Sequence, residues 1–212
     1  MVIYMTSVPV ILDIVGSRDL PDRVVAHSVI MDAFARIEEQ IVPDHPAWAT
    51  VGDEFQAVYF SWQDAVRSLY RVHLLLPAEV QVRAGVGMGR ITTIARSVTG
   101  PIHDGPGWIA AREALNEAEV LQQSLPAVRH RLRGEDADLA VAVNAQFLAV
   151  DQVLARFKSR ERRMAGALLH GVTQREIAQS EGISQAAVSK AVHRSGAAML
   201  LRLDRELAGE TS

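Results

Sequence analysis

The chain has 212 residues, no cysteine and a net charge of −3, and 49% of its residues are hydrophobic. These values predict a folded globular protein with room for one ordinary domain and a small one, and they exclude disulfides and cysteine-ligated zinc. Residues 1–150 carry 12 Arg and 18 Asp or Glu, a net of −6, whereas residues 151–212 carry 10 Lys or Arg and 7 acids, a net of +3. An acidic body with a basic C-terminal part is the distribution that DNA binding through that part needs.

The first part of the chain alternates predicted strands and helices. Residues 8–15 form a short Val/Ile-rich run that ends at Gly16 and predicts a buried strand. Because Asp13 interrupts this run, we expect no signal peptide, no membrane span and a cytoplasmic location. Helical spacing and turn residues then predict a helix over 21–41, strands over 47–51 and 55–60 around a Gly52-Asp53 hairpin turn, a helix over 65–76, a strand over 80–91 and a helix over 108–123.

The second part is predicted to be helical from about Leu139, after a polar stretch over 129–138. The order β-α-β-β-α-β-α is close to the ferredoxin-like arrangement, an antiparallel sheet with helices on one face. The sequence therefore predicts an α+β fold followed by a separate, small all-α domain.

Residues 173–192, TQREIAQSEGISQAAVSKAV, carry the pattern of a helix-turn-helix. Thr173 and Glu176 form a capping box that begins the first helix, Gly182 supplies the positive φ of a tight turn, and Ser184 caps the second helix. The small Ala178 lets the two helices approach closely. The pattern resembles the DNA-binding motif of many bacterial regulators and sigma-factor-like domains; the alternative is a helical hairpin that only packs or dimerises.

The outer surface of this motif supplies the predicted contacts to DNA. Its polar groups are able to reach base edges or phosphates, and they belong to Thr173, Gln174, Ser184, Gln185, Ser189, Lys190, His193 and Arg194. Five basic residues just upstream are either phosphate contacts or a solvated helix face: Arg156, Lys158, Arg160, Arg162 and Arg163.

Charged residues beside glycines mark a second candidate site in the first part of the chain. Asp13 comes at the end of the first strand and Asp53 at the hairpin tip. If the two strands pair, both carboxylates can share Mg²⁺ or Mn²⁺, the cations that serve phosphoryl transfer. Arg112 comes from the first turns of a helix behind a Gly-Pro-Gly break. Taken singly, each aspartate is more often a turn residue than a ligand.

Other notable residues carry structural interpretations. Gly85, Gly87 and Gly89 alternate on one face of a strand, so a helix or a second subunit packs very close there. Trp108 is expected in the core or at an interface. Four histidines show no metal-ligand spacing: His27, His73, His103 and His130.

Four motifs in the order DIVGSRDLPDR, VGDEFQAVY, RAGVGMGRI and DGPGWIAAREAL resemble the SatD family over about residues 8–120. More distantly, they are similar to class III nucleotidyl cyclases and GGDEF domains. The resemblance implies a cyclase-like sheet in which Asp13, Asp53 and the Ile14 carbonyl bind metal, Arg112 stabilises a transition state and Asp104 reads a base.

The sequence departs from the cyclase pattern at two positions. The asparagine that cyclases have four residues before the arginine is here Trp108, and the base-reading lysine before the hairpin is Ala49. Losing both removes charge stabilisation and base specificity, each costing on the order of a hundredfold in rate. We therefore favour a ligand-binding or structural descendant of the cyclase scaffold over an active cyclase.

The sequence thus predicts a dimeric DNA-binding transcription regulator. Residues 1–135 are predicted to form a SatD/cyclase-like α+β domain that binds a nucleotide or metal or serves only for dimerisation. Residues 136–212 are predicted to form a helical linker and the helix-turn-helix domain, whose partner is double-stranded DNA. The alternative is an active metal-dependent nucleotidyl cyclase or nucleotide-processing enzyme coupled to a DNA-binding domain.

Overall fold

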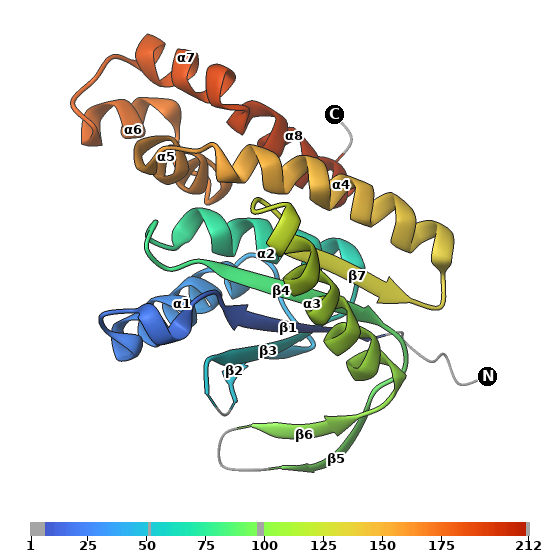
Figure 1. The fold of residues 1–212 in the computed structure, drawn as a ribbon. Helices are drawn as coiled ribbons and strands as arrows, with labels where there is room; N and C mark the ends of the chain where they lie inside the picture. The colour runs from blue at the N-terminus through green and yellow to red at the C-terminus, as the bar shows by residue number, and fades with distance from the viewer. Residues whose placement is uncertain (1–6, 51, 97–99, 211–212) are drawn as a thin grey trace.

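A five-stranded sheet in the order β2-β3-β1-β4-β7 forms the centre of the molecule (Figure 1). The structure, a computed structural model, describes residues 7–50, 52–96 and 100–210. Neighbouring strands are antiparallel, except that β7 is parallel to β4. The strands of this sheet are β1 (Val8–Ile14), β2 (His45–Ala49), β3 (Glu54–Tyr59), β4 (Val82–Met88) and β7 (His130–Gly134).

Helices cover both faces of the sheet. Side chains alternate along a strand, so Val10 and Leu12 of β1 enter the main core under two helices, α1 (Arg23–Glu38) and α2 (Trp62–Leu75). A short 3₁₀ turn, η1 (Ser17–Asp19), lies between β1 and α1. Ile11 faces the other way and packs under α3 (Pro106–Ser124). The α+β class is confirmed. The prediction that the helices lie on one face of the sheet was wrong. The helices α1 and α2 cover one face, and α3 covers the opposite face.

The alternating glycines of β4 are where α3 lies against the sheet. A Cβ on Gly85 would run into the backbone of Ala111 and Leu115, and one on Gly87 would run into the backbone of Gly107 and Ala111. Only glycine permits an approach this close. Of the two alternatives that the sequence left open, a helix therefore fills this position.

Three strands were missing from the predicted element order: β7, and two short strands that follow β4. The predicted strand over 80–91 ends at Met88, and the chain then forms a separate two-stranded sheet from β5 (Thr92–Arg96) and β6 (Pro101–Asp104). Just after β4, Gly89 lies close against Gly107 of α3. Figure 1 shows this hairpin on the side of the sheet away from the C-terminal helices. Val51, the last residue of one predicted strand, lies outside the described residues.

The polar stretch over 129–138 contains β7. Its inward side chains, His130 and Leu132, are fully buried. The outward arginines, Arg131 and Arg133, both form ion pairs with Glu117 of α3. The sequence of this stretch is polar because the side chains on the outward face of β7 are arginines in ion pairs.

The helix α4 (Ala137–Ala155) closes the free edge of β7 with two polar side chains. Asn144 accepts a hydrogen bond from Leu132 N (2.8 Å) and donates one to Leu132 O (2.9 Å). Seven residues later on the same helix face, Asp151 accepts from Arg129 N and His130 N. Among the described residues α4 is the one helix long and apolar enough to span a membrane. Its polar contacts to β7 hold it against the sheet.

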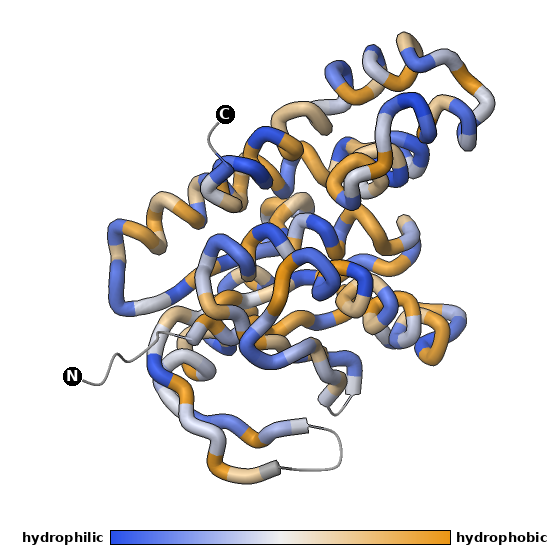
Figure 2. The backbone as a smooth tube through the Cα atoms, turned by 180° about the vertical axis from the view of Figure 1, so that it is seen from behind, coloured by the Kyte–Doolittle hydropathy of each residue, from blue (hydrophilic) through white to orange (hydrophobic). Residues whose placement is uncertain are grey.

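The remaining helices form a layer above α2 (Figure 1). Met164 of α5 and Leu200 of α8 belong to the same hydrophobic core as Leu69 of α2, so the core continues across the predicted boundary at residues 135–136. Orange, hydrophobic stretches run accordingly from the sheet into these helices (Figure 2). The division into two domains stays a prediction. The helices are α5 (Ser159–Leu169), α6 (Gln174–Ser180), α7 (Gln185–Ser195) and α8 (Ala197–Leu207).

Candidate functional sites

A row of charged side chains crosses the sheet on the face that α3 partly covers. In register, Glu54 of β3 lies beside Asp13 of β1, which lies beside Arg83 of β4. Arg83 Nη2 is 2.8 Å from Asp13 Oδ2 and 2.9 Å from an oxygen of Glu119 on α3. At the other end of the row, Arg112 Nη2 is 2.6 Å from Glu54 Oε2. The row therefore links α3 to the sheet at both ends.

The two predicted metal ligands lie next to one another. Ile14 N donates to Asp53 O (3.3 Å), which joins the end of β1 to the hairpin tip. Burial raises the pKa of Asp13, Arg83 opposes this, and the nearby charge of Asp53 raises it further. The carboxylate of Asp53 has no hydrogen bond or ion pair among the described residues, whereas Asp13 is bound to Arg83.

These donors do not form a complete metal site by themselves. No group of three or more His, Cys, Asp or Glu side chains gathers in the described part of the chain. The guanidinium of Arg83 already supplies a positive charge at Asp13. Mg²⁺ takes six oxygen ligands and is usually held by one or two carboxylates with water and substrate phosphates, so the two aspartates with the Ile14 carbonyl would need water or a phosphate to complete the shell. The metal assignment of Asp13, Ile14 and Asp53 stays a prediction.

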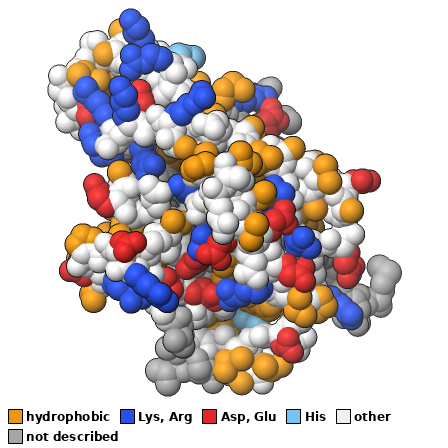
Figure 3. Space-filling view, viewed as in Figure 1, with side chains coloured by type: hydrophobic (Ala, Val, Ile, Leu, Met, Phe, Trp, Pro, Cys, Tyr) orange, Lys and Arg blue, Asp and Glu red, His pale blue; other side chains and the backbone are white. Residues whose placement is uncertain are grey.

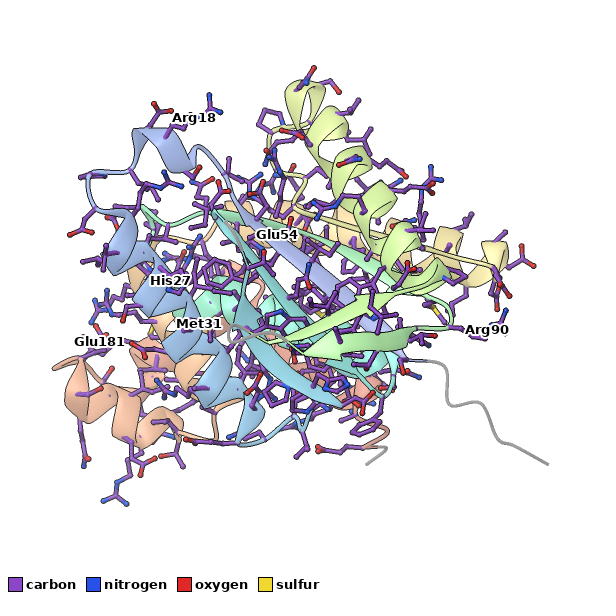
Figure 4. All side chains as sticks on the ribbon, turned by 90° about the horizontal axis from the view of Figure 1, so that it is seen from below. Arg18, His27, Met31, Glu54, Arg90 and Glu181 are labelled. Atoms are coloured by element: carbon purple, nitrogen blue, oxygen red, sulfur yellow. The ribbon has the colours of Figure 1, made fainter. Side chains whose placement is uncertain are left out.

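A pocket of about 330 Å³ opens beside this row, between α3 and the sheet. Arg112, Trp108 and Gln56 line it. In Figure 4, Glu54 lies on the sheet between α1, which carries His27 and Met31, and α3. Asp104, predicted to act with Arg112, does not line the pocket; it accepts a hydrogen bond from Gly105 N at the start of α3.

Aromatic rings close one side of the pocket. Trp108 stacks on His103 at a centroid distance of 5.6 Å, and Trp48 lies edge-on to Trp108 at 6.1 Å. Trp108 also packs against the small core under α3, as the sequence predicted. Its indole Nε1 is buried without a hydrogen-bond partner in the described structure.

The second candidate site comprises α6 and α7, joined by residues 181–184. Thr173 Oγ1 accepts from Glu176 N (3.2 Å) and Ser184 Oγ accepts from Ala187 N (3.2 Å), as the capping patterns predicted. Gly182 has φ 63°. The two helices bury four apolar side chains between themselves and the core: Ile177, Ala178, Val188 and Val192.

Most of the predicted DNA contacts lie on the outer surface of these helices. Gln174 and Ser189 are half-buried, and the exposed ones are Thr173, Ser184, Gln185, Lys190, His193 and Arg194. The hydroxyls of Thr173 and Ser184 are used as helix caps, and Arg194 lies 3.4 Å from Glu161. Which of these residues touches DNA stays a prediction.

The upstream basic residues divide into two groups. Arg160 and Arg163 both pair with Glu181, at 3.1 Å each, at the start of the turn between α6 and α7. Arg162 was expected to be exposed, and this was wrong: its guanidinium is half-buried and lines a cavity with His73 and other residues. It points inward because α5 packs on α2.

Sequence reasoning missed Arg83 and Glu54 as partners of the predicted site residues. Arg83 precedes Gly85 by two residues and therefore shares the face of β4 that meets α3. That period of two was visible in the sequence. The pairing of Arg83 with Asp13 was not visible, because the register between β1 and β4 joins residues 70 positions apart.

Comparison with known proteins gives one family and several distant structures. The chain matches the SatD family over residues 7–210, and it has no match among curated proteins. It is similar to the catalytic core of a rhodopsin-guanylyl cyclase with converted specificity in complex with ATPαS: 16% identity, 53% of this chain, 72% of that chain, TM-score 0.44. It is also similar to adenylate cyclases from Trypanosoma brucei in their monomeric state, with 17% identity, 51% of this chain and 67% of that chain covered, and a TM-score of 0.39.

A regulator of polyketide synthase expression from Bifidobacterium adolescentis is similar over more of the chain: 14% identity, 95% of this chain, 80% of that chain, TM-score 0.28. The family match extends well beyond residues 8–120, where the sequence motifs lie, and takes in α4 to α8. Over both the sheet and the C-terminal helices, this chain belongs to the SatD family.

Proposed function

We propose that this protein is a DNA-binding transcription regulator whose recognition helix is α7. The observation that carries the proposal is the combination of a capped helix pair, a tight glycine turn and an outer face that offers Gln185, Lys190 and His193 to solvent. Side chains of these types on an exposed helix are able to contact base edges and phosphates in a major groove.

The charge balance around α6 and α7 supports the proposal. Between residues 156 and 194 there are 8 basic and 3 acidic side chains. All three acids are engaged internally: Glu161 with Arg194, Glu176 with Thr173, and Glu181 with two arginines of α5. Blue side chains gather over α5, α6 and α7 at the upper left of Figure 3.

Three basic residues of this region are free for a partner. Arg156, Arg175 and Lys190 are exposed and have no hydrogen bond or ion pair in the part of the chain that is described. Lysine and arginine contacts to phosphates supply most of the affinity of a protein for DNA and make it depend on salt. A surface with unpaired Lys and Arg side chains, whose acidic side chains are already paired, therefore suits a polyanionic partner.

Substitution of Lys190 tests the proposal. Binding to a library of genomic fragments, followed by anisotropy on the enriched duplex, is expected to give a preference over bulk DNA that weakens with rising salt. Lys190→Ala is expected to lower the affinity roughly 10- to 100-fold, the loss of one base or phosphate contact.

Arg90→Ala is the matched control, since it removes one exposed positive charge far from the motif. In Figure 4, Arg90 lies at the opposite side of the molecule from Glu181 of the α6–α7 turn. Equal losses for both variants, or no preference for any fragment, would contradict the proposal and leave α6 and α7 as a packing hairpin.

The proposal includes a homodimer. A two-fold pair of α7 helices matches a pseudo-palindromic site with half-sites about one helical turn apart. The enriched sequence from the fragment library therefore serves as a second readout. A site without two-fold symmetry, bound at one chain per duplex, would speak against this part of the proposal alone.

A second candidate function is nucleotide binding at the pocket beside Arg112. The pocket is large enough for part of a nucleotide, is lined by the Arg112 guanidinium and the Trp108 ring, and lies beside the charged row that contains Asp13. A ligand that binds the native state raises its melting temperature. We expect at least one nucleoside triphosphate, with or without Mn²⁺, to stabilise the wild type.

Asp53→Ala separates metal-assisted binding from simple binding. Because Asp53 has no partner among the described side chains, this variant is expected to keep its fold. Loss of the Mn²⁺-dependent part of the stabilisation assigns the metal to Asp53. No stabilisation by any nucleotide, together with no turnover, would remove this candidate and leave the first domain as a dimerisation module.

A further inference from the structure

A small cavity lies where the sheet half of the molecule meets the C-terminal helices. Its volume is about 100 Å³, room for about three water molecules at roughly 30 Å³ each. The walls come from α2, the segments just before β4 and β7, α4 and α5. The polar side chains that line it are His73, Gln81, Arg129, Asp151 and Arg162.

The cavity carries two guanidinium groups without a carboxylate in contact. Arg129 donates only to neutral acceptors, the Pro126 and Val128 carbonyls and Gln81. The side chain of Arg162 has no hydrogen bond or ion pair among the described residues, and the nearest acid that acts on it, Glu79, does so without contact. Burial lowers the pKa of both arginines.

The one carboxylate in the wall is already occupied. Asp151 is 1% exposed. It accepts hydrogen bonds from Arg129 N (2.7 Å), His130 N (3.1 Å) and His130 Nδ1 (2.5 Å). These three bonds fix β7 to α4, so Asp151 cannot turn to pair with Arg162. The cavity is left with an excess of positive charge on two half-buried guanidinium groups, which a bound anion would balance.

A buried histidine adds an unpartnered polar atom. His73 of α2 is 7% exposed, lines the cavity, and has an Nε2 that finds no hydrogen-bond partner in the described structure. Buried polar atoms in native proteins are nearly always paired with protein, water or a ligand. An oxyanion in the cavity would accept from Nε2–H and from the fork of Arg162 at once.

We propose that this cavity binds a small tetrahedral oxyanion, inorganic phosphate or the phosphoryl group of a small ligand, held by Arg162, Arg129 and His73. The site joins α2 and the segment just before β4 to α5, and α5 in turn contacts α6 and α7. Occupancy would therefore fix the sheet half of the molecule against the helices. The proposal does not rest on DNA or nucleotide binding.

Titration of the full chain with phosphate tests the site. Calorimetry is expected to show saturable binding, and the melting temperature is expected to rise by about 5 °C at roughly a hundredfold excess over Kd. Chloride at equal ionic strength is expected to give no such rise. An equal rise in both salts would overturn the proposal.

Arg162→Gln is expected to weaken phosphate binding at least tenfold. Arg90→Gln is the matched control: it removes one charge from an exposed position outside the cavity, and is expected to bind like the wild type. Wild-type binding by Arg162→Gln would overturn the proposal. If that variant does not fold, Arg162→Lys keeps the charge and is expected to bind several-fold more weakly, and unchanged binding there would overturn it as well.

Three further anions identify the chemistry of the bound group. Binding of sulfate and phosphate but not of a nucleoside monophosphate supports a free inorganic oxyanion. Binding of the monophosphate through the same Arg162 supports the phosphoryl end of a larger ligand. Acetate binding with the same affinity as phosphate would contradict a tetrahedral site.

Discussion

Asp204→Ala is expected to lower the free energy of unfolding by about 3–5 kcal/mol, a large part of the stability of a single domain. Asp204 of α8 accepts from Arg71 Nη2 (2.8 Å) and Arg71 Nε (3.2 Å), and from Arg67 Nε (3.2 Å). The side chain of Arg71 is only 4% exposed. Removing the carboxylate leaves a buried guanidinium without its counter-charge, and urea denaturation measures the cost.

Glu206→Ala is the matched control on the same helix. Glu206 pairs with Arg202 one turn away, and both side chains are about half exposed. Exposed pairs of this kind contribute about 0.3–0.5 kcal/mol. The double variant Arg71→Met with Asp204→Ala is expected to lose less than the sum of the two single variants, because it leaves no uncompensated charge. Similar losses for Asp204→Ala and Glu206→Ala would contradict the buried pair.

Acidification from about pH 7.5 to about pH 5 is expected to lower the free energy of unfolding by at most about 2 kcal/mol through His73. Burial, then the charges of His130, Arg129 and Arg162, hold the pKa of His73 well below its usual 6.5 in the folded state. Between these pH values the unfolded chain binds a proton at this position that the folded chain does not. Stability therefore falls as the pH drops below 6.5.

His170 contributes in the same direction, since burial lowers its pKa to about 4. Denaturation curves at a series of pH values give the free energy of unfolding as a function of pH. We expect its slope to be smaller in His73→Gln than in the wild type. His193→Gln, which changes an exposed histidine of α7, serves as the control with the wild-type slope. A full wild-type slope in His73→Gln would show that this group does not set the pH dependence.

Local patterns predicted the elements that rest on neighbouring residues. Thr173 with Glu176, Ser184 and Gly182 were read from the sequence alone, because capping and positive φ depend on residues within a few positions. The proximity of Asp13 and Asp53 followed from a short hairpin and period-two strands. The α+β class followed from the order of these elements.

Features that depend on long-range register were not predictable in the same way. Arg83 reaches Asp13 only because β4 pairs with β1, and Arg162 points inward only because α5 lies on α2. β7 was missed because its outward arginines resemble a polar loop until Glu117 of α3 is placed beside them. In each case the partner lies outside any local sequence window.

The closed edge of β7 limits how this protein assembles. An exposed edge strand invites pairing with another chain, and here Asn144 and Asp151 already occupy the backbone groups that such a chain would need. The opposite edge, β2, carries Pro46 and a register shift between His45 and Trp48, features that also resist strand addition. Extension of the five-stranded sheet is therefore resisted at both of its edges, so a second copy that docks on this sheet has to use helices or side-chain surfaces, and the folded chain is protected from aggregation through these two edges.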